Sequence, residues 1–250
     1  MKREEKLLIN KIPALKKLHL KSDKFTMEGI KKNIIPPTFK HLNFIYNLVK
    51  KNKRVSSLEF GVGWSSLIIS KALDENKKKY FYKSLFLKRI FKNNLFMNYV
   101  IDGEKKYLKI FKNFSRNTGL KNIRFKKILW QYMLKKNSIV AYGKNLPGIV
   151  PDFIYLDGPN PKKIINKSKK FDKTLNFPVI VNDLLFYENF LNNGCILVIE
   201  GRAHNASYLL RELKRNWKYQ YFKKIDTHIF KLDDKNTGVL ARKLTNFYKK

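Results

Sequence analysis

The chain has 250 residues, and 54 Lys and Arg residues against 19 Asp and Glu residues give it a formal net charge of +35. Hydrophobic residues make up 44% of the chain and aromatic residues 14%, enough for a buried core, which excludes wholesale disorder. No apolar run approaches the roughly 18 residues that cross a bilayer, which excludes an integral membrane protein.

Residues 1–37 are predicted to form an N-terminal helical segment with a break near Pro13, closed by Pro36-Pro37. Thr38 then suits the N-cap of a helix, because apolar residues follow it at helical spacing. These residues are Phe39, Leu42, Ile45, Leu48 and Val49. We expect this helix to open a larger domain, residues 38–250.

A strand, a glycine turn and a helix come next. Residues 54–60 are predicted to form the strand, residues 61–63 the turn and residues 64–73 the helix. Residues 76–98 are dense in Lys and aromatic side chains, and we expect an insertion that contains helix. A second strand, 99–102, follows it.

The middle of the chain continues the alternation of helix and strand. Residues 104–117 are predicted to be helical, residues 122–129 to form a third strand, and residues 142–150 to form a loop rich in Gly and Pro. Residues 151–157 form the clearest strand, because the Gly-Pro-Asn-Pro sequence at 158–161 forces a turn after it.

The last elements are a helix at 180–192, a strand at 195–200, a helix at 204–214 and two strands near 218–224 and 227–232. The fourth and fifth strands are continuously apolar, as expected when helices cover both faces of a sheet. The pattern therefore predicts an α/β doubly wound, Rossmann-like, mostly parallel sheet. The lone Cys195 cannot form an internal disulfide, which favours a reducing compartment, the cytoplasm.

Four acids stand at the ends of predicted strands, in a chain that has few acids. They are Glu59, Asp102, Asp157 and Glu200. Ligands of an open parallel sheet bind at the carboxyl ends of its strands, where the strand order reverses. An acid after the second strand suits the hydroxyls of a ribose, so we expect a cofactor that contains a nucleoside.

The glycine turn argues against a dinucleotide. A dinucleotide fingerprint reads GxGxxG, but here Ser66 stands at the third glycine position. Four segments resemble the motifs of class I S-adenosylmethionine-dependent methyltransferases, in the right order over residues 38–232. They are Glu59-Phe-Gly61-Val-Gly63-Trp-Ser65, Val-Ile-Asp102-Gly-Glu-Lys-Lys-Tyr-Leu, Phe-Ile-Tyr-Leu-Asp157-Gly-Pro and Gly-Cys-Ile-Leu-Val-Ile-Glu200-Gly.

The resemblance implies a sheet of seven strands whose last strand is antiparallel, with S-adenosylmethionine lying over the first, second and fourth strands. The motif around Glu59, Gly61, Gly63 and Ser65 would hold the methionine part, and Asp102 would bind the ribose. Trp130 or Gln131 would lie near the adenine, and Asp157 would face the sulfonium. The wide spacing between Gly63 and Asp102 is attributed to the insertion.

Each of these residues also has a structural interpretation. Asp102 could cap the following helix, Asp157 could cap a turn, and Trp130 could belong to the core. A hydroxyl nucleophile needs a base, for which Asp157 is the first candidate and His204 the second. His204 could equally be a surface residue at a helix start.

A Mg²⁺-dependent reaction is an alternative that is not favoured. The catechol-type O-methyltransferases resemble this order of motifs but have an Asp-Asn pair after the fifth strand, where this chain has Glu200-Gly201. The missing ligand argues against a metal, although Asp157 and Glu200 could hold Mg²⁺ with water.

The predicted activity is methylation of an oxygen on a small molecule or sugar. RNA methylation is the alternative, because the charge of +35 suits phosphates, and a non-enzymatic RNA or anionic-membrane binder is the rival. The 45 Lys, 9 Arg and 25 Asn residues also fit compositional bias, because Arg is the better phosphate ligand.

Overall fold

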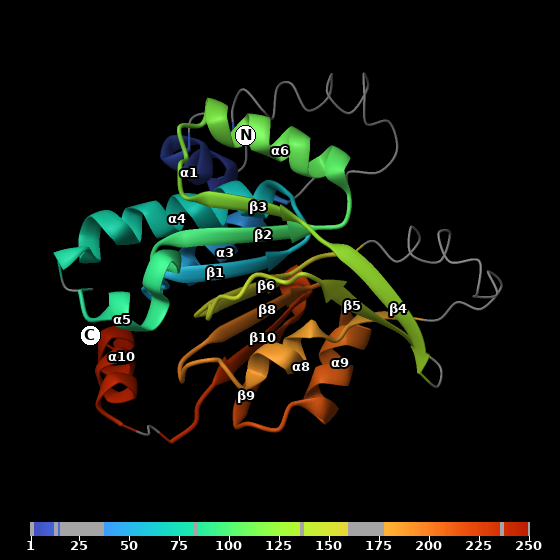
Figure 1. Ribbon diagram of the computed structural model, residues 1–250. Helices are drawn as coiled ribbons and strands as arrows, with labels where there is room; N and C mark the ends of the chain where they lie inside the picture. Colours follow the sequence, from blue (N-terminus) through green and yellow to red (C-terminus); the bar gives the residue numbers. More distant parts are fainter. Residues whose placement is uncertain are drawn as a thin grey trace.

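The computed structural model describes most of the chain (Figure 1). It describes residues 3–12, 15, 38–82, 85–135, 138–159, 178–235 and 238–249. Much of the predicted N-terminal segment, with Pro13 and Pro36-Pro37, and the end of the turn at residues 160–161 lie outside these ranges.

Seven strands form the main sheet. In spatial order they are β3 (Ile123–Lys127), β2 (Met97–Asp102), β1 (Ser56–Phe60), β6 (Phe153–Leu156), β8 (Ile196–Glu200), β10 (Thr227–Leu232) and β9 (Trp217–Phe222). The first five are mutually parallel, and β10 runs antiparallel to both of its neighbours. This confirms the predicted fold class, including the antiparallel final strand. The strand order reverses between β1 and β6, which is where an open sheet of this kind binds ligands.

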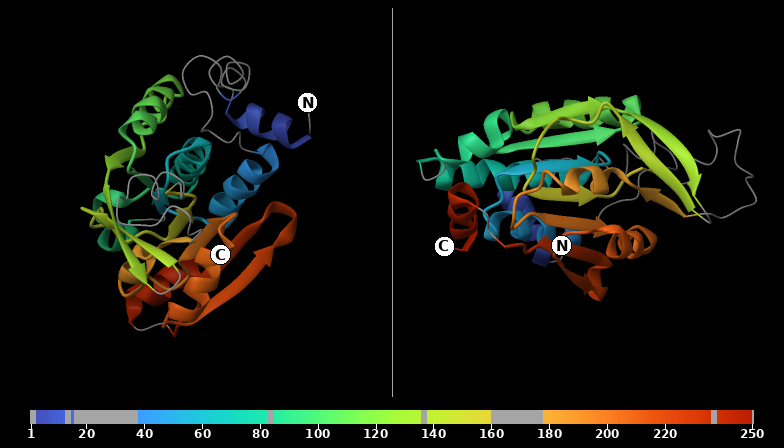
Figure 2. Two further views of the ribbon diagram at one scale, coloured as in Figure 1. Left: turned by 90° about the vertical axis from the view of Figure 1, so that its right-hand side faces the viewer. Right: turned by 60° about the horizontal axis from the view of Figure 1, so that its bottom comes forward.

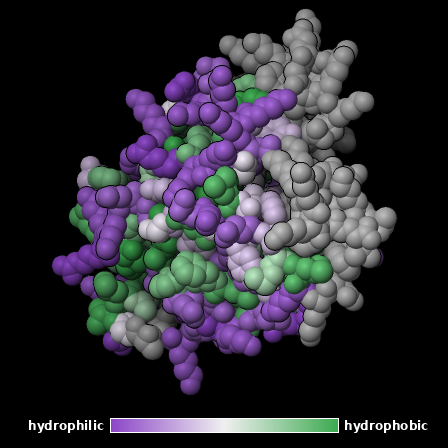
Figure 3. All heavy atoms as spheres, turned by 45° about the vertical axis from the view of Figure 1, so that its right-hand side comes forward, coloured by the Kyte–Doolittle hydropathy of each residue, from purple (hydrophilic) through white to green (hydrophobic). Residues whose placement is uncertain are grey.

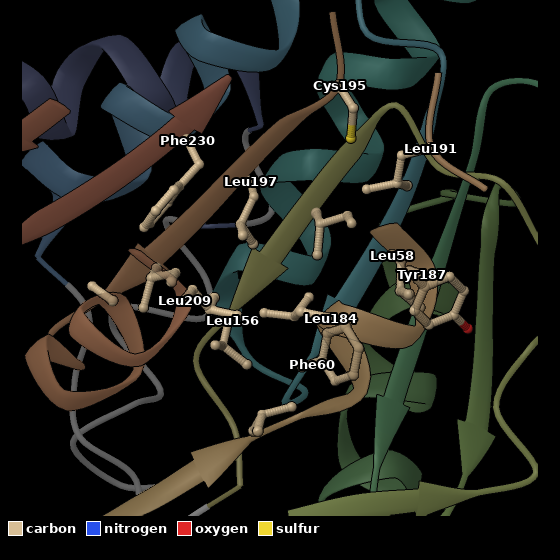
Figure 4. Packing of buried hydrophobic residues seen from close by; sticks show 14 of the residues in the cluster. Leu58, Phe60, Leu156, Leu184, Tyr187, Leu191, Cys195, Leu197, Leu209 and Phe230 are labelled. Atoms are coloured by element: carbon tan, nitrogen blue, oxygen red, sulfur yellow. The ribbon is translucent and has the colours of Figure 1, made fainter. Parts of the chain in front are cut away.

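Helices cover both faces of the sheet (Figure 1). One face packs against α1 (Arg3–Lys11), α3 (Phe39–Lys51) and α4 (Trp64–Tyr80), and the other against α8 (Asp183–Glu188) and α9 (Ala203–Glu212). Because side chains alternate along a strand, β6 sends Phe153 and Tyr155 to the first face and Ile154 and Leu156 to the second. Figure 4 shows part of the second face, where the buried Cys195 packs among leucines and aromatic rings.

Thr38 caps α3 as predicted, because its hydroxyl accepts a hydrogen bond from the backbone N–H of His41 at 3.3 Å. The five predicted apolar residues differ in the degree of their burial. Leu42, Ile45 and Val49 are buried, whereas Phe39 and Leu48 are partly buried at the edge of the same cluster. The helical period therefore identified the face that α3 turns to the sheet.

The predicted insertion consists of a longer helix and a short one. The helix α4 continues to Tyr80, α5 spans Leu87–Phe91, and the 3-10 turn η2 (Lys92–Asn94) leads to β2. The helix α6 (Lys105–Asn117) then joins β2 to β3. The helices α4 and α5 and the turn η2 account for the long separation between the glycine turn and Asp102.

A helix that the sequence analysis did not predict, α10 (Val239–Lys249), closes the amino-terminal edge of the sheet. Its Tyr248 donates a hydrogen bond to the buried carboxylate of Asp152 at 2.8 Å. The guanidinium of Arg54 lies 3.6 Å from the centre of the Tyr248 ring. The helix is thus attached to the core by a buried polar cluster.

A second, three-stranded sheet contradicts two of the predicted elements. It consists of β4 (Leu129–Lys135), β5 (Ser138–Lys144) and β7 (Val179–Val181). The predicted loop at 142–150 is wrong at its start, which belongs to β5, and the predicted helix at 180–192 is wrong at its start, which belongs to β7. Figure 2 shows the hairpin of β4 and β5 projecting beyond the carboxyl ends of the main strands.

The surface is predominantly hydrophilic on the face shown in Figure 3, with separate hydrophobic groups between the polar ones. Within the described ranges, no helix combines the length and the apolar character that crossing a membrane requires.

Candidate active site

The four predicted acids lie along one edge of the sheet. Asp102 and Glu200 end β2 and β8, Asp157 directly follows β6, and Glu59 is the last residue but one of β1; these four strands are adjacent and parallel. The parallel direction of these strands brings acids that are far apart in the sequence to the same edge. The predicted juxtaposition of the acids is thus present in the structure.

Two glycines hold the turns after β1 and β6 against each other. Gly61 has a φ of +99°, and a Cβ built on it would lie 2.7 Å from the backbone nitrogen of Gly158. A Cβ on Gly158 would lie 2.7 Å from the Cα of Gly61. The sequence analysis placed Gly61 in the motif that would hold the methionine part of the cofactor, but the close packing of the two backbones already requires glycine at this position.

Gly63 is different, because it has room around it. Its backbone is extended, with a φ of −164°, and a Cβ would meet only the Oγ of Ser65, at an ordinary distance of 3.6 Å. Gly63 is the N-cap of α4, and its N–H donates to the Oγ of Ser66 at 3.2 Å. The space beside Gly63 opens at the start of this helix, where backbone N–H groups favour ligand oxygens.

Glu59 and Ser65 bond to each other below the turn. The Ser65 hydroxyl donates to Glu59 Oε1 at 2.5 Å, and the Asn98 amide donates to Oε2 at 3.2 Å. Glu59 is fully buried, and this desolvation raises the pKa of its carboxyl to about 8 despite these hydrogen bonds. The pair fixes the first turn of α4 to the end of β1.

Asp102 links two neighbouring turns. One carboxylate oxygen accepts the backbone N–H of Val62 at 3.0 Å, and the other accepts that of Glu104 at 2.7 Å. The N-cap of α6 is Glu104, so Asp102 is not the cap residue itself. The Asp102 side chain is half-buried, and a carboxylate accepts several hydrogen bonds in different directions.

Trp130 lies against the turn after β2. A Cβ on Gly103 would come within 2.6 Å of the Trp130 ring, so the indole occupies the space beside that glycine. Trp130 also packs on the core cluster of the second sheet, so the two interpretations of this residue are compatible. Gln131, the next residue of β4, is exposed on the opposite face of the strand.

Asp157 stands at the mouth of the site. Asp157 as a whole residue is exposed to solvent. The protein atoms around its carboxylate nevertheless desolvate that group, and the negative charge of Glu200 lies nearby. Both effects raise the pKa of Asp157 to about 6. Arg202 supports the same turn, since its Nη2 donates to the carbonyl oxygens of Asp157 at 2.5 Å and Pro159 at 2.8 Å.

The sequence analysis missed a buried polar cluster next to Glu200. Glu200 Oε2 lies 2.9 Å from His41 Nε2 and also accepts a hydrogen bond from the Tyr155 hydroxyl. Burial alone would raise the pKa of Glu200, but the bonds from His41 and Tyr155 outweigh it and lower that pKa. His41 stands four residues before Ile45, on the apolar face of α3. A histidine at such a position is expected to be buried and to need a polar partner, and this was the signal available in the sequence.

His204, the second predicted base, is exposed in the first turn of α9. Glu200, one of the two carboxylates considered as Mg²⁺ ligands, is engaged by His41 and Tyr155. In the ranges that the structure describes, no three His, Cys, Asp or Glu side chains are grouped so that they could hold a metal ion.

Comparison with protein-family models gives no match, and comparison with curated proteins gives none. Solved structures do match. A putative caffeoyl-CoA O-methyltransferase from Staphylococcus aureus aligns with a TM-score of 0.50 and 13% identity, over 90% of this chain and 99% of that one. The chain has the class I methyltransferase fold.

The methyltransferase fold agrees with the resemblance that the strand-end motifs predicted. An O-methyltransferase from Bacillus cereus in complex with SAH aligns with a TM-score of 0.49 and 10% identity, over 88% of this chain and 90% of that one. At these identities the likeness concerns the fold alone, so the activity and cofactor are inferred from the site.

Proposed function

We propose that the protein is an S-adenosylmethionine-dependent methyltransferase that methylates an oxygen of a small molecule or sugar. The observation that carries the proposal is the group of acids at the reversal point of a methyltransferase fold, beside the open turn at Gly63. This is the crevice in which such sheets bind nucleoside cofactors.

The charges of the site fit this cofactor. S-adenosylmethionine carries a positive sulfonium and a positive ammonium group, and the crevice gathers carboxylates in a chain whose net charge is +35. Asp102 would accept hydrogen bonds from the ribose hydroxyls, and Trp130 would place its ring beside the same turn for the adenine. Arg202 Nε is buried and has no hydrogen-bond partner among the described residues, so it can donate to a ligand oxygen.

The bound cofactor would supply an electrophilic methyl group, and the chain would position the acceptor and take its proton. Asp157 is our proposed base, because it directly follows β6 at the carboxyl edge of the sheet and its raised pKa of about 6 leaves it mainly ionised near neutral pH. Arg202 would hold the turn that carries this carboxylate. The near-attack geometry of acceptor and methyl group would supply most of the rate enhancement.

The first test is calorimetry with S-adenosylmethionine and S-adenosylhomocysteine, with NAD as a negative control. We expect selective binding to the unaltered protein and binding weakened about 10- to 100-fold in Asp102→Asn, the range for a lost hydrogen bond to a charged group. Asp233→Asn, a control on the far side of the sheet, should bind normally. Absence of binding to folded protein would overturn the proposed function, and normal binding by Asp102→Asn would overturn only the ribose assignment.

The second test is the pH dependence of methyl transfer. Because Asp157 is a base only when ionised, we expect kcat/KM to rise as the pH increases through about 6 and then to level off. Asp157→Asn should lower kcat by about 100-fold or more and abolish this rise. If His204→Ala abolishes the rise and Asp157→Asn keeps it, the base is His204.

A further inference from the structure

The opposite end of the molecule from the candidate site carries a second surface of unusual composition. The strand β2 starts at Met97 beside α5 and η2 and ends at Asp102 in the site, a length of about 20 Å. Figure 1 shows α5 and the end of α4 at the amino-terminal edge of the strands, beside α10. A ligand of this surface therefore does not contact the candidate site.

Apolar side chains project from the turn that joins α4 to α5. Tyr82 is 86% exposed, Leu85 57% and Phe81 39%. The base of the turn is fixed, because Phe247 of α10 packs edge-on against the rings of Tyr80 and Phe86, at centroid distances of 5.6 and 6.2 Å. The exposed side chains thus stand on an ordered support.

Positive charge surrounds these apolar side chains. Between residues 76 and 101 the sequence contains seven Lys and Arg residues and no acid. A pocket of about 500 Å³ here is lined by Lys77, Lys88 and Lys92, by Asn93, and by Phe81, Leu95 and Phe96. The lysine ammonium groups repel one another around this pocket, so an anion that entered it would be stabilised.

The nearest acids do not neutralise the pocket. Asp74 pairs with Lys78 at 3.1 Å, and Glu75 pairs with Lys50. Within the described part of the chain, none of the ion pairs involves Lys77, Lys88 or Lys92. Three exposed lysines are therefore available to an external anion.

We propose that this surface, the α4–α5 patch (Lys77, Phe81, Tyr82, Leu85, Lys88 and Lys92), docks the protein on an anionic membrane. The projecting Leu85 and Tyr82 gain from entry into the boundary of headgroups and acyl chains, which an aqueous polyanion does not offer. The lysines are attracted by the surface potential of anionic lipids, and the pocket accepts a lipid phosphate. RNA fits less well, because phosphate recognition favours Arg over the three lysines of this patch and because the aliphatic Leu85 gains from entry into a lipid boundary but not from contact with RNA.

The test is co-sedimentation of the full chain with vesicles of phosphatidylcholine alone or mixed with phosphatidylglycerol. We expect binding to the anionic vesicles only. Lys88→Ala with Lys92→Ala should weaken it by about 25-fold, from about fivefold for each lysine near an anionic surface. Tyr82→Ser with Leu85→Ser, which leaves the charge unchanged, should weaken it by about tenfold or more.

Two matched controls separate docking from general attraction. Lys109→Ala with Lys112→Ala removes two exposed charges from α6, and Leu210→Ser removes an exposed leucine from α9, so both should bind normally. Equal losses in patch and control variants would overturn the proposal. Unchanged vesicle binding by the variant Tyr82→Ser with Leu85→Ser would also overturn the proposal. The same holds if the patch variants lose affinity for single-stranded RNA but keep their vesicle binding. Circular dichroism would verify that each variant is folded.

Discussion

Alanine in place of Gly61 is expected to lower the free energy of unfolding by about 2–5 kcal/mol. A left-handed backbone costs a residue with a Cβ about 1–2 kcal/mol, and forced overpacking of this kind costs about 1–3 kcal/mol. Both apply here, because Gly61 has a φ of +99° and its Cβ would lie 2.7 Å from the backbone nitrogen of Gly158. Urea denaturation measured by circular dichroism would quantify the loss.

Gly63→Ala is the matched control, since it makes the same change two residues away. Its φ of −164° suits any residue and its Cβ would meet only Ser65 Oγ at 3.6 Å, so a loss of about 1 kcal/mol or less is expected. Gly158→Ala should resemble Gly61→Ala, because the two glycines face each other. Equal stability of the Gly61 and Gly63 variants would show that the turns after β1 and β6 are not packed as described.

Gly63→Ala also separates folding from binding. A methyl group at this position would enter the open space beside the start of α4, where we propose that the cofactor lies. The variant should therefore fold normally while its calorimetric affinity for S-adenosylmethionine falls. Gly61 and Gly63 belong to one motif in the sequence, but the structure distinguishes them: Gly61 packs against Gly158, whereas Gly63 faces open space.

The sequence predicted the sheet because its central strands carry an unambiguous signal. Residues 153–156 and 196–199 are uninterrupted apolar runs, which only a sheet covered on both faces explains. Asp157 and Glu200 could be predicted for the same reason, because each one stands at the end of such a strand. When an acid stands at the end of a parallel strand, its place in the sequence also determines that it lies at the carboxyl edge of the sheet.

The elements that were missed lack such a signal or have a competing one. The strand β4 has only exposed and half-buried residues, and β5 has a buried apolar run of just three residues, Ile139, Val140 and Ala141, so the hairpin carries a weak signal. In residues 179–188 a strand of three residues passes into a helix of six residues with only Asn182 between them, and periodicity cannot assign elements that are so short. His41 was missed because its partners, Tyr155 and Glu200, lie more than 100 residues away in the chain.

Glu59 gives the second large expected effect, a fall in stability as the pH rises. Its folded pKa of about 8 lies above the unfolded value of 4.5, so the folded state holds the proton more tightly. Below pH 4.5 Glu59 is protonated in both states, so its titration does not change the free energy of unfolding. Between pH 4.5 and about 8 folding takes up a proton at Glu59, so the stability conferred by the protonated form is lost as the pH rises through this range. At 1.36 kcal/mol per pH unit, this difference amounts to about 5 kcal/mol.

Glu59→Gln should remove this pH dependence, because the amide resembles the neutral carboxyl in shape and does not titrate. At pH 5 the variant should be about 1 kcal/mol less stable, because the amide NH₂ cannot accept the bond that one of the two oxygens accepts. At pH 9 it should be several kcal/mol more stable than the unaltered protein. Urea unfolding from pH 5 to 9 would give the difference between the two proteins.

Glu75→Gln is the control, because the pKa of Glu75 is lowered in the folded protein whereas the pKa of Glu59 is raised. Burial alone would raise the pKa of Glu75, but the hydrogen bonds from Lys50 and Tyr46 lower it, so Glu75 stays ionised in the folded protein from pH 5 to 9. Its difference curve should be flat over that window. A flat curve for Glu59→Gln as well would mean that Glu59 is ionised in the folded protein, and that the carboxylate below the turn is a permanent negative charge facing the start of α4.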